Sequence, residues 1–191
     1  NDNIRAMAER LAAEGYIVLA VDLFGGNSAT DPESARQLML RAVENRDSVT
    51  SNIQQAYAFV TTTAGAPRVA SLGWCFGGGW SLNTALLFPT ELDAAVIYYG
   101  QVTDDEAKLS PLDVPILGLF GSEDRGIKVE SVRRFEEALE RLGKDHEIHI
   151  YEGAGHAFAN PSGNNFNARY AENAWNRTLG FLGTHLGKGS T

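Results

Sequence analysis

The chain has 191 residues, of which 43% are hydrophobic and 21% charged, and its formal net charge is −8. This length is enough for one domain with a substantial core. An acidic chain without a cluster of lysine and arginine is not expected to bind nucleic acid or an anionic membrane surface, and no apolar run approaches the roughly 20 residues of a membrane span. The single cysteine, Cys75, cannot form an internal disulfide, which favours a reducing, cytoplasmic location.

Helical spacings and apolar runs follow one another from the start of the chain. Apolar residues at helical spacing predict a helix from Ile4 to Leu11. The run 17–23, Ile-Val-Leu-Ala-Val-Asp-Leu, has the composition of a buried strand. Residues 33–63 contain neither glycine nor proline, so we expect one long helix or two consecutive helices over 32–63.

The remainder of the chain continues the alternation of strands and helices. We expect strands at 69–74, 94–99, 115–120 and 146–152, helices at 80–88, 129–142 and 166–186, and a mobile tail at 187–191. This order predicts a three-layer α/β fold, a mostly parallel sheet with helices on both faces, in a single domain over 1–191. In such sheets, binding and catalytic sites lie at the carboxyl ends of the strands.

The sequence Gly73-Trp74-Cys75-Phe76-Gly77 follows the expected strand at 69–74 and precedes a helical pattern. Gly-x-nucleophile-x-Gly is typical of a nucleophile on a sharp strand-to-helix turn, where the residues two positions away on either side pack against each other and must lack bulk. Such a turn also points backbone N–H groups at the place where a tetrahedral oxyanion forms. The alternative is a buried structural cysteine beside a glycine-rich packing turn.

Two further reactive side chains follow the ends of later strands. Asp124 follows the strand at 115–120, and His156 follows the strand at 146–152. The chain order of nucleophile, acid and histidine is that of the α/β-hydrolase triad. An imidazole can take the thiol proton, and a carboxylate can orient the imidazole. Glu123, next to Asp124, is the alternative acid.

The other candidates favour structural roles. His146 and His149 lie on opposite faces of a strand, and their spacing does not suggest a metal site. His185 falls in the last turn of the closing helix, and Asp22 precedes a glycine turn. The glycine run 77–79 does not match a phosphate-binding loop. We therefore expect neither a metal nor an organic cofactor.

With these motifs, the chain resembles the dienelactone hydrolase family of α/β-hydrolases. The resemblance covers nearly the whole chain and rests on residues 1–25, 73–78, 98–100, 121–124 and 153–158. It implies that Cys75 is the nucleophile, Asp124 the orienting acid and His156 the base, and that the amide of Phe76 is one oxyanion donor. The most specific signature of the family is the cysteine on the strand-to-helix turn, followed by the glycine run Gly77-Gly78-Gly79.

The resemblance also implies a substrate class. Family members that hydrolyse dienelactone hold its carboxylate with arginines, whereas this chain has Gly25-Gly26-Asn27 and Asn160 at those places. A buried carboxylate without a charged partner is costly, so we expect hydrolysis of small, uncharged, short-chain carboxylic esters. The alternatives are dienelactone hydrolysis itself (carboxymethylenebutenolidase activity), or a catalytically weak or non-enzymatic α/β scaffold. The expected pocket residues are Phe24, Trp74, Phe76, Tyr99, Phe158 and Asn160.

A departure from the family pattern concerns the start of the chain. The resemblance implies earlier strands, the last of which ends in a His-Glu-x-x-Gly-type loop that supplies a second oxyanion N–H. This sequence begins after that loop, so it is either a fragment or closes the sheet in another way. Because a missing central strand exposes two edges, we expect a homo-oligomer that covers them.

Overall fold

The computed structural model describes residues 2–29 and 31–187. The chain divides into two compact units, one formed by residues through Val69 and the other by Ala70–Gly187. The tail predicted at 187–191 lies, beyond Gly187, outside the described residues. None of the helices in these two described ranges combines the length and the apolar character that a membrane span requires.

The first unit is helical. It contains α1 (Asp2–Ala13), α2 (Pro32–Glu44), α3 (Arg46–Ala58) and the π-helical turn η1 (Phe59–Thr63). The Asp31 side chain caps α2 by accepting a hydrogen bond from the Ser34 amide at 2.9 Å. The backbone leaves helical geometry at Asn45, with φ −106° and ψ 43°. The expectation of two consecutive helices is therefore confirmed, with η1 added at the end of the second.

The strand predicted at 17–23 is wrong. Residues 16–22 have no regular secondary structure, and Ile17, Leu19 and Val21 are 61%, 42% and 37% exposed. The apolar composition is that of a strand, but a strand also needs neighbours for its backbone hydrogen bonds. No strand formed by the described residues pairs with this run.

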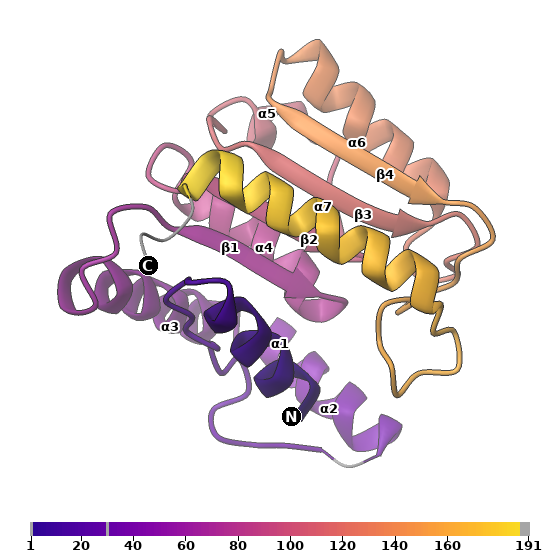
Figure 1. The fold of residues 1–191 in the computed structure, drawn as a ribbon, viewed down its shortest axis with the longest axis horizontal. Helices are drawn as coiled ribbons and strands as arrows, with labels where there is room; N and C mark the ends of the chain where they lie inside the picture. The colour runs from indigo at the N-terminus through magenta and orange to yellow at the C-terminus, as the bar shows by residue number, and fades with distance from the viewer. Residues whose placement is uncertain (1, 30, 188–191) are drawn as a thin grey trace. The chain divides into compact units, whose positions relative to one another are not determined.

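The second unit is built on a parallel sheet (Figure 1). The described residues form β1 (Ala70–Trp74), β2 (Ala94–Tyr98), β3 (Ile116–Gly121) and β4 (His146–Tyr151), which lie side by side in that order. Every residue of β2 and β3 is buried, as expected for central strands covered on both faces. The register pairs Trp74 with Tyr98 and Gly121 with Tyr151, so the carboxyl ends of neighbouring strands meet at one edge.

Helices cover both faces of this sheet. In Figure 1, α7 (Ala168–Leu186) crosses in front of the sheet, and α4 (Phe76–Leu87) and α6 (Val129–Arg141) lie behind it. The crossovers between successive parallel strands share one handedness and so place their helices on one face, while α7 follows the last strand and closes the other. This confirms the α/β-hydrolase-like fold class.

Two details of the helices differ from expectation. Helix α4 begins at Phe76 rather than at residue 80, because the glycines at 77–79 continue the helix instead of forming a loop. A short helix, α5 (Glu106–Leu109), lies between β2 and β3. Its four residues are too few for a helical spacing to be visible in the sequence.

Candidate active site

Cys75 lies on the sharp turn between β1 and α4. Its backbone has φ 54° and ψ −118°, a conformation that L-residues rarely adopt, and the residue is exposed. A Cβ atom at Gly73 would lie 2.0 Å from the carbonyl oxygen of Gly77, whereas a Cβ at Gly77 would have no other atom within 4 Å. The steric argument from the sequence therefore holds for Gly73 but is wrong for Gly77.

The turn brings Cys75 to two residues far away in the chain. The Nε2 atom of His156 is 3.1 Å from Cys75 Sγ, and its Nδ1 atom is 2.7 Å from Asp124 Oδ2. The three residues follow the carboxyl ends of β1, β3 and β4. The parallel register thus assembles a thiol, an imidazole and a carboxylate into one hydrogen-bonded chain.

Asp124 is held firmly in this arrangement. Its side chain is 1% exposed, and its Oδ1 atom accepts hydrogen bonds from the amides of Gly126 at 2.7 Å and Ile127 at 2.9 Å. These two bonds leave Oδ2 directed at His156. The neighbouring Glu123 is exposed, so the structure places Asp124, and not Glu123, against the imidazole.

The loop that carries His156 is held by two contacts and has a strained backbone. Asn165 donates a side-chain hydrogen bond to the His156 carbonyl at 2.9 Å. The ring of Tyr99 meets the imidazole edge to face, with centroids 5.3 Å apart. The next residue, Ala157, has φ 60°, so the backbone is strained beside the imidazole. Asn165 was not identified from the sequence, because a loop asparagine carries no motif.

The charges of Cys75 and His156 depend on each other. Although Cys75 is exposed, protein atoms around its sulfur remove part of its hydration and so raise the pKa of the thiol. The hydrogen bond and charge of His156 and the Phe76 amide outweigh this effect and leave the pKa lowered. The hydrogen bond to Cys75 and the bond to Asp124 outweigh burial and raise the pKa of His156 to about 9. Both shifts favour a thiolate and an imidazolium at neutral pH.

Phe76 is the first residue of α4, and its backbone amide donates a hydrogen bond to the Cys75 sulfur. A helix N-terminus carries partial positive charge and free N–H groups. Negative charge that develops next to the sulfur is therefore stabilised at this point.

The residues predicted to line the substrate pocket differ in burial and in the contacts that they make. Trp74 is half-buried, with its ring 5.3 Å from that of Tyr98. Tyr99 is 2% exposed and Phe158 is fully buried, so both offer little surface to a substrate. Tyr99 packs against the imidazole of His156, and Phe158 packs against Tyr99. Asn160 accepts the Ser162 amide in a turn. Phe24 belongs to the other unit, and its pocket role stays a prediction.

The remaining histidines and Asp22 make local contacts. His149 lies 3.1 Å from an Arg177 nitrogen, and burial, followed by the charge of Arg177, lowers its pKa. The ring of His185 packs 4.5 Å from that of Phe181. The Asp22 carboxylate accepts hydrogen bonds from the amides of Phe24 and Gly26, which confirms its role in the turn.

Comparison with known proteins identifies the family of this chain. The model of the dienelactone hydrolase family matches residues 1–186. The chain belongs to the dienelactone hydrolase family. Two curated relatives carry the name "Putative carboxymethylenebutenolidase". The relative from Saccharolobus solfataricus is 30% identical, and the match covers 95% of this chain and 84% of the relative. The relative from Escherichia coli K12 is 31% identical, and the match covers 100% of this chain and 74% of the relative.

Solved structures share the fold. A dienelactone hydrolase-like promiscuous phosphotriesterase from metagenomic libraries has a TM-score of 0.86 and 23% identity, and the match covers 98% of this chain and 82% of that one. A structure described as a dienelactone hydrolase from Klebsiella pneumoniae, assigned provisionally, has a TM-score of 0.77 and 24% identity, with 95% and 81% covered. Membership of this hydrolase family supports an enzymatic function.

We expect Gly73→Ala to destabilise this family member strongly and Gly77→Ala to be tolerated. The added methyl group at Gly73 meets backbone atoms that cannot rotate away, which costs about 1–3 kcal/mol or more of unfolding free energy. At Gly77 the methyl group enters open space in a helix, where replacing glycine contributes up to about 1 kcal/mol. Urea unfolding of the two variants measures both. Equal losses would show that the turn tolerates no side chain at either position.

Proposed function

We propose that this protein hydrolyses small, uncharged, short-chain carboxylic esters through a thioester formed on Cys75. The observation that carries the proposal is the hydrogen-bonded chain from Cys75 Sγ through His156 to Asp124, at the carboxyl ends of three parallel strands. A nucleophile, a base within hydrogen-bond reach and a group that orients the base together form the arrangement required for acyl transfer.

The acylation step begins from the thiolate and imidazolium. The Cys75 sulfur attacks the ester carbonyl carbon, and the carbonyl electrons move to oxygen, which the Phe76 amide stabilises. When the carbonyl re-forms, the C–O bond of the ester breaks and His156 gives its Nε2 proton to the leaving alkoxide. The products are a free alcohol, the Cys75 thioester and a neutral imidazole.

Deacylation follows from the change in charge on sulfur. The hydrogen bond to Cys75 is the largest cause of the raised pKa of His156, and the acylated sulfur no longer carries negative charge. The pKa of the imidazole therefore falls in the acyl-enzyme, and Nε2 can take a proton from water. The hydroxide adds to the thioester carbonyl, the carboxylic acid leaves, and the thiolate and imidazolium return.

The preference for uncharged esters rests on the electrostatics of the site. The strongest charged influences on Cys75 and His156 come from each other and from Asp124, not from an arginine or lysine. Asn160, just beyond the histidine, is neutral and accepts the Ser162 amide. A second candidate is dienelactone hydrolysis, because curated relatives are named carboxymethylenebutenolidase, with the assignment provisional.

The catalytic roles predict a sharp ranking of variants. Cys75→Ala removes the only thiol and should reduce turnover by about 10³-fold or more. Asp124→Asn keeps the shape of the side chain but disfavours the productive tautomer and the imidazolium, so we expect a loss on the order of 10³–10⁴-fold in kcat. Release of p-nitrophenol from p-nitrophenyl acetate, with circular dichroism of each variant, measures these effects.

The matched control is Glu123→Gln, which makes the same chemical change one residue away on an exposed side chain. It should keep its activity within about 2-fold, because exposed charges contribute little. A larger loss in Glu123→Gln than in Asp124→Asn would transfer the orienting role to Glu123. Near-normal turnover by Cys75→Ala would refute the thioester mechanism.

The pH dependence of kcat/KM should be bell-shaped. At low pH the thiolate is protonated and attack stops, and the acidic limb lies below the ordinary thiol pKa because the pKa of Cys75 is lowered. Above pH about 9, His156 loses the proton that the leaving group needs, so activity falls. Asp124→Asn removes a cause of the raised pKa and should move the basic limb to lower pH. A basic limb that stays in place would show that another group controls it.

Substrate preference is tested by comparing a neutral aryl acetate with a dienelactone that carries a free carboxylate. We expect kcat/KM to be higher for the neutral ester, because a carboxylate brought into the site loses hydration without gaining a cationic partner. Initial rates over the same concentration range and at constant ionic strength give the ratio. A large advantage for the anionic lactone would contradict the preference, while leaving the thioester mechanism intact.

A further inference from the structure

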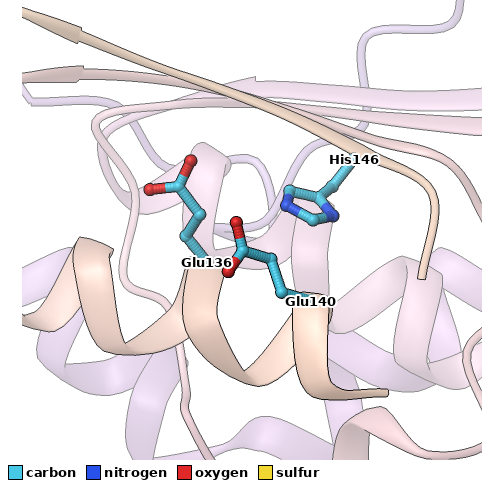
Figure 2. Close-up of side chains that lie close together, drawn as sticks. All are labelled: Glu136, Glu140 and His146. Atoms are coloured by element: carbon cyan, nitrogen blue, oxygen red, sulfur yellow. The ribbon is translucent and has the colours of Figure 1, made fainter. Parts of the chain in front are cut away.

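A second cluster of reactive side chains lies away from Cys75, between α6 and β4. Glu136 and Glu140 project from α6, and His146 is the first residue of β4 (Figure 2). One carboxylate oxygen of each glutamate and one ring nitrogen of the histidine all lie within 4.8 Å of one another. We propose that Glu136, Glu140 and His146 bind a divalent transition-metal ion, with Zn²⁺ as the best match.

The local fold explains why the three side chains meet. Residues four apart on a helix lie on the same face, one turn above the other, so both glutamates point in one direction. A short turn at 142–145, with Gly143 at φ 63°, returns the chain to β4. His146 then stands on the edge strand beside the face of α6 that carries the carboxylates.

The tautomer of His146 suits a ligand. Its Nδ1 atom lies 2.8 Å from the carbonyl oxygen of Lys144. Because a carbonyl can only accept, Nδ1 carries the proton and Nε2 presents a lone pair. Histidine ligands of metals commonly donate their other ring N–H to a backbone carbonyl in this way, which fixes the orientation of the ring.

The two carboxylates of the cluster have no ion-pair partner among the described residues. No arginine or lysine in residues 2–29 and 31–187 forms an ion pair with Glu136 or Glu140. Three basic side chains nearby in the sequence are held by other partners: Arg134 by Asp104, Arg141 by Glu106 and Glu137, and Lys144 by the Ser110 carbonyl. Arg133, one helical turn before Glu136, forms no ion pair with either glutamate. Two adjacent carboxylates that no described basic side chain neutralises in an ion pair attract a bound cation.

The donor set and its spacing favour Zn²⁺. Zinc binds imidazole nitrogen and carboxylate oxygen at about 2.0–2.2 Å, which places tetrahedral ligands about 3.3 Å apart. Closing the spacing from 4.8 Å requires rotation of the two glutamate side chains, one of which is half-buried and the other exposed. Three protein ligands leave one coordination position for water. Such an ion would link α6 to the edge strand β4.

The experiment measures Zn²⁺ binding by isothermal titration calorimetry in the Cys75→Ala chain, because Cys75 and His156 could themselves bind zinc. We expect one Zn²⁺ per chain in the micromolar range. Glu140→Gln and His146→Gln, each added to Cys75→Ala, should weaken binding at least tenfold, since even loss of an outer-shell partner commonly weakens a metal site about 10–100-fold. The control is Glu137→Gln, which removes one charge from the same helix outside the cluster and should change the affinity less than about 2-fold.

Thermal unfolding provides a second readout. Zn²⁺ should raise the Tm of Cys75→Ala and of its Glu137→Gln form, because an ion that binds only the folded chain stabilises it. It should not raise the Tm of the Glu140→Gln or His146→Gln forms. Circular dichroism without zinc checks that every variant folds. Absence of binding, or binding that these two substitutions leave unchanged, would overturn the proposal.

Discussion

The geometry of the site depends on the close approach of Gly73 to the carbonyl of Gly77. This approach occurs in the sharp turn that joins β1 to α4. Because Gly73 has no side chain, the two arms of the turn meet and Cys75 is held at φ 54°. That conformation directs the sulfur away from the core and sets the Phe76 amide beside it. A side chain at Gly73 would open the turn and separate the sulfur from both His156 and the helix N-terminus.

The charge state of the site depends in turn on how Asp124 is held. A buried carboxylate is costly unless it is hydrogen-bonded, and the Gly126 and Ile127 amides supply two of the bonds it needs. Since these bonds occupy Oδ1, Oδ2 is left for His156. The carboxylate thereby favours the imidazolium, and the imidazolium favours the thiolate. Each charge in the chain is thus stabilised by its neighbour, and the shifts in the pKa values of Cys75 and His156 come from these neighbours and from burial.

The sequence predicted the parts of the molecule that depend on local patterns. The strands of the second unit and the approach of Cys75, Asp124 and His156 follow from apolar runs and from the rule that parallel strands end at one edge. The run 17–23 failed because composition does not show whether a strand has a neighbour. The sequence places Phe158 in a pocket wall, whereas its side chain is fully buried against Tyr99 and Tyr151, because nearness to His156 along the chain does not show which way a ring faces.

The contacts that sequence reasoning missed join residues without a motif. Asn165 reaches the His156 carbonyl through a loop whose path no periodicity predicts. The spacing along the strand relates His146 only to His149, whereas its neighbours in space include the glutamates of the preceding helix. Recognising that set requires knowing which face of α6 packs on β4. This information is a property of tertiary packing and not of spacing along the chain.

The assembly of several chains expected from the sequence stays a prediction, and two features of the structure bear on it. Among the described residues, β1 has a strand neighbour on one side only, which is β2. The apolar run 17–23 is mostly exposed and belongs to no strand of the described residues. The edge of a sheet and an apolar segment outside any sheet both present backbone groups to which another strand can bind. An assembly that covered the edge of β1 would bring new residues close to Cys75, since Cys75 directly follows that strand. Access to the thiol and association of the chains would then be coupled.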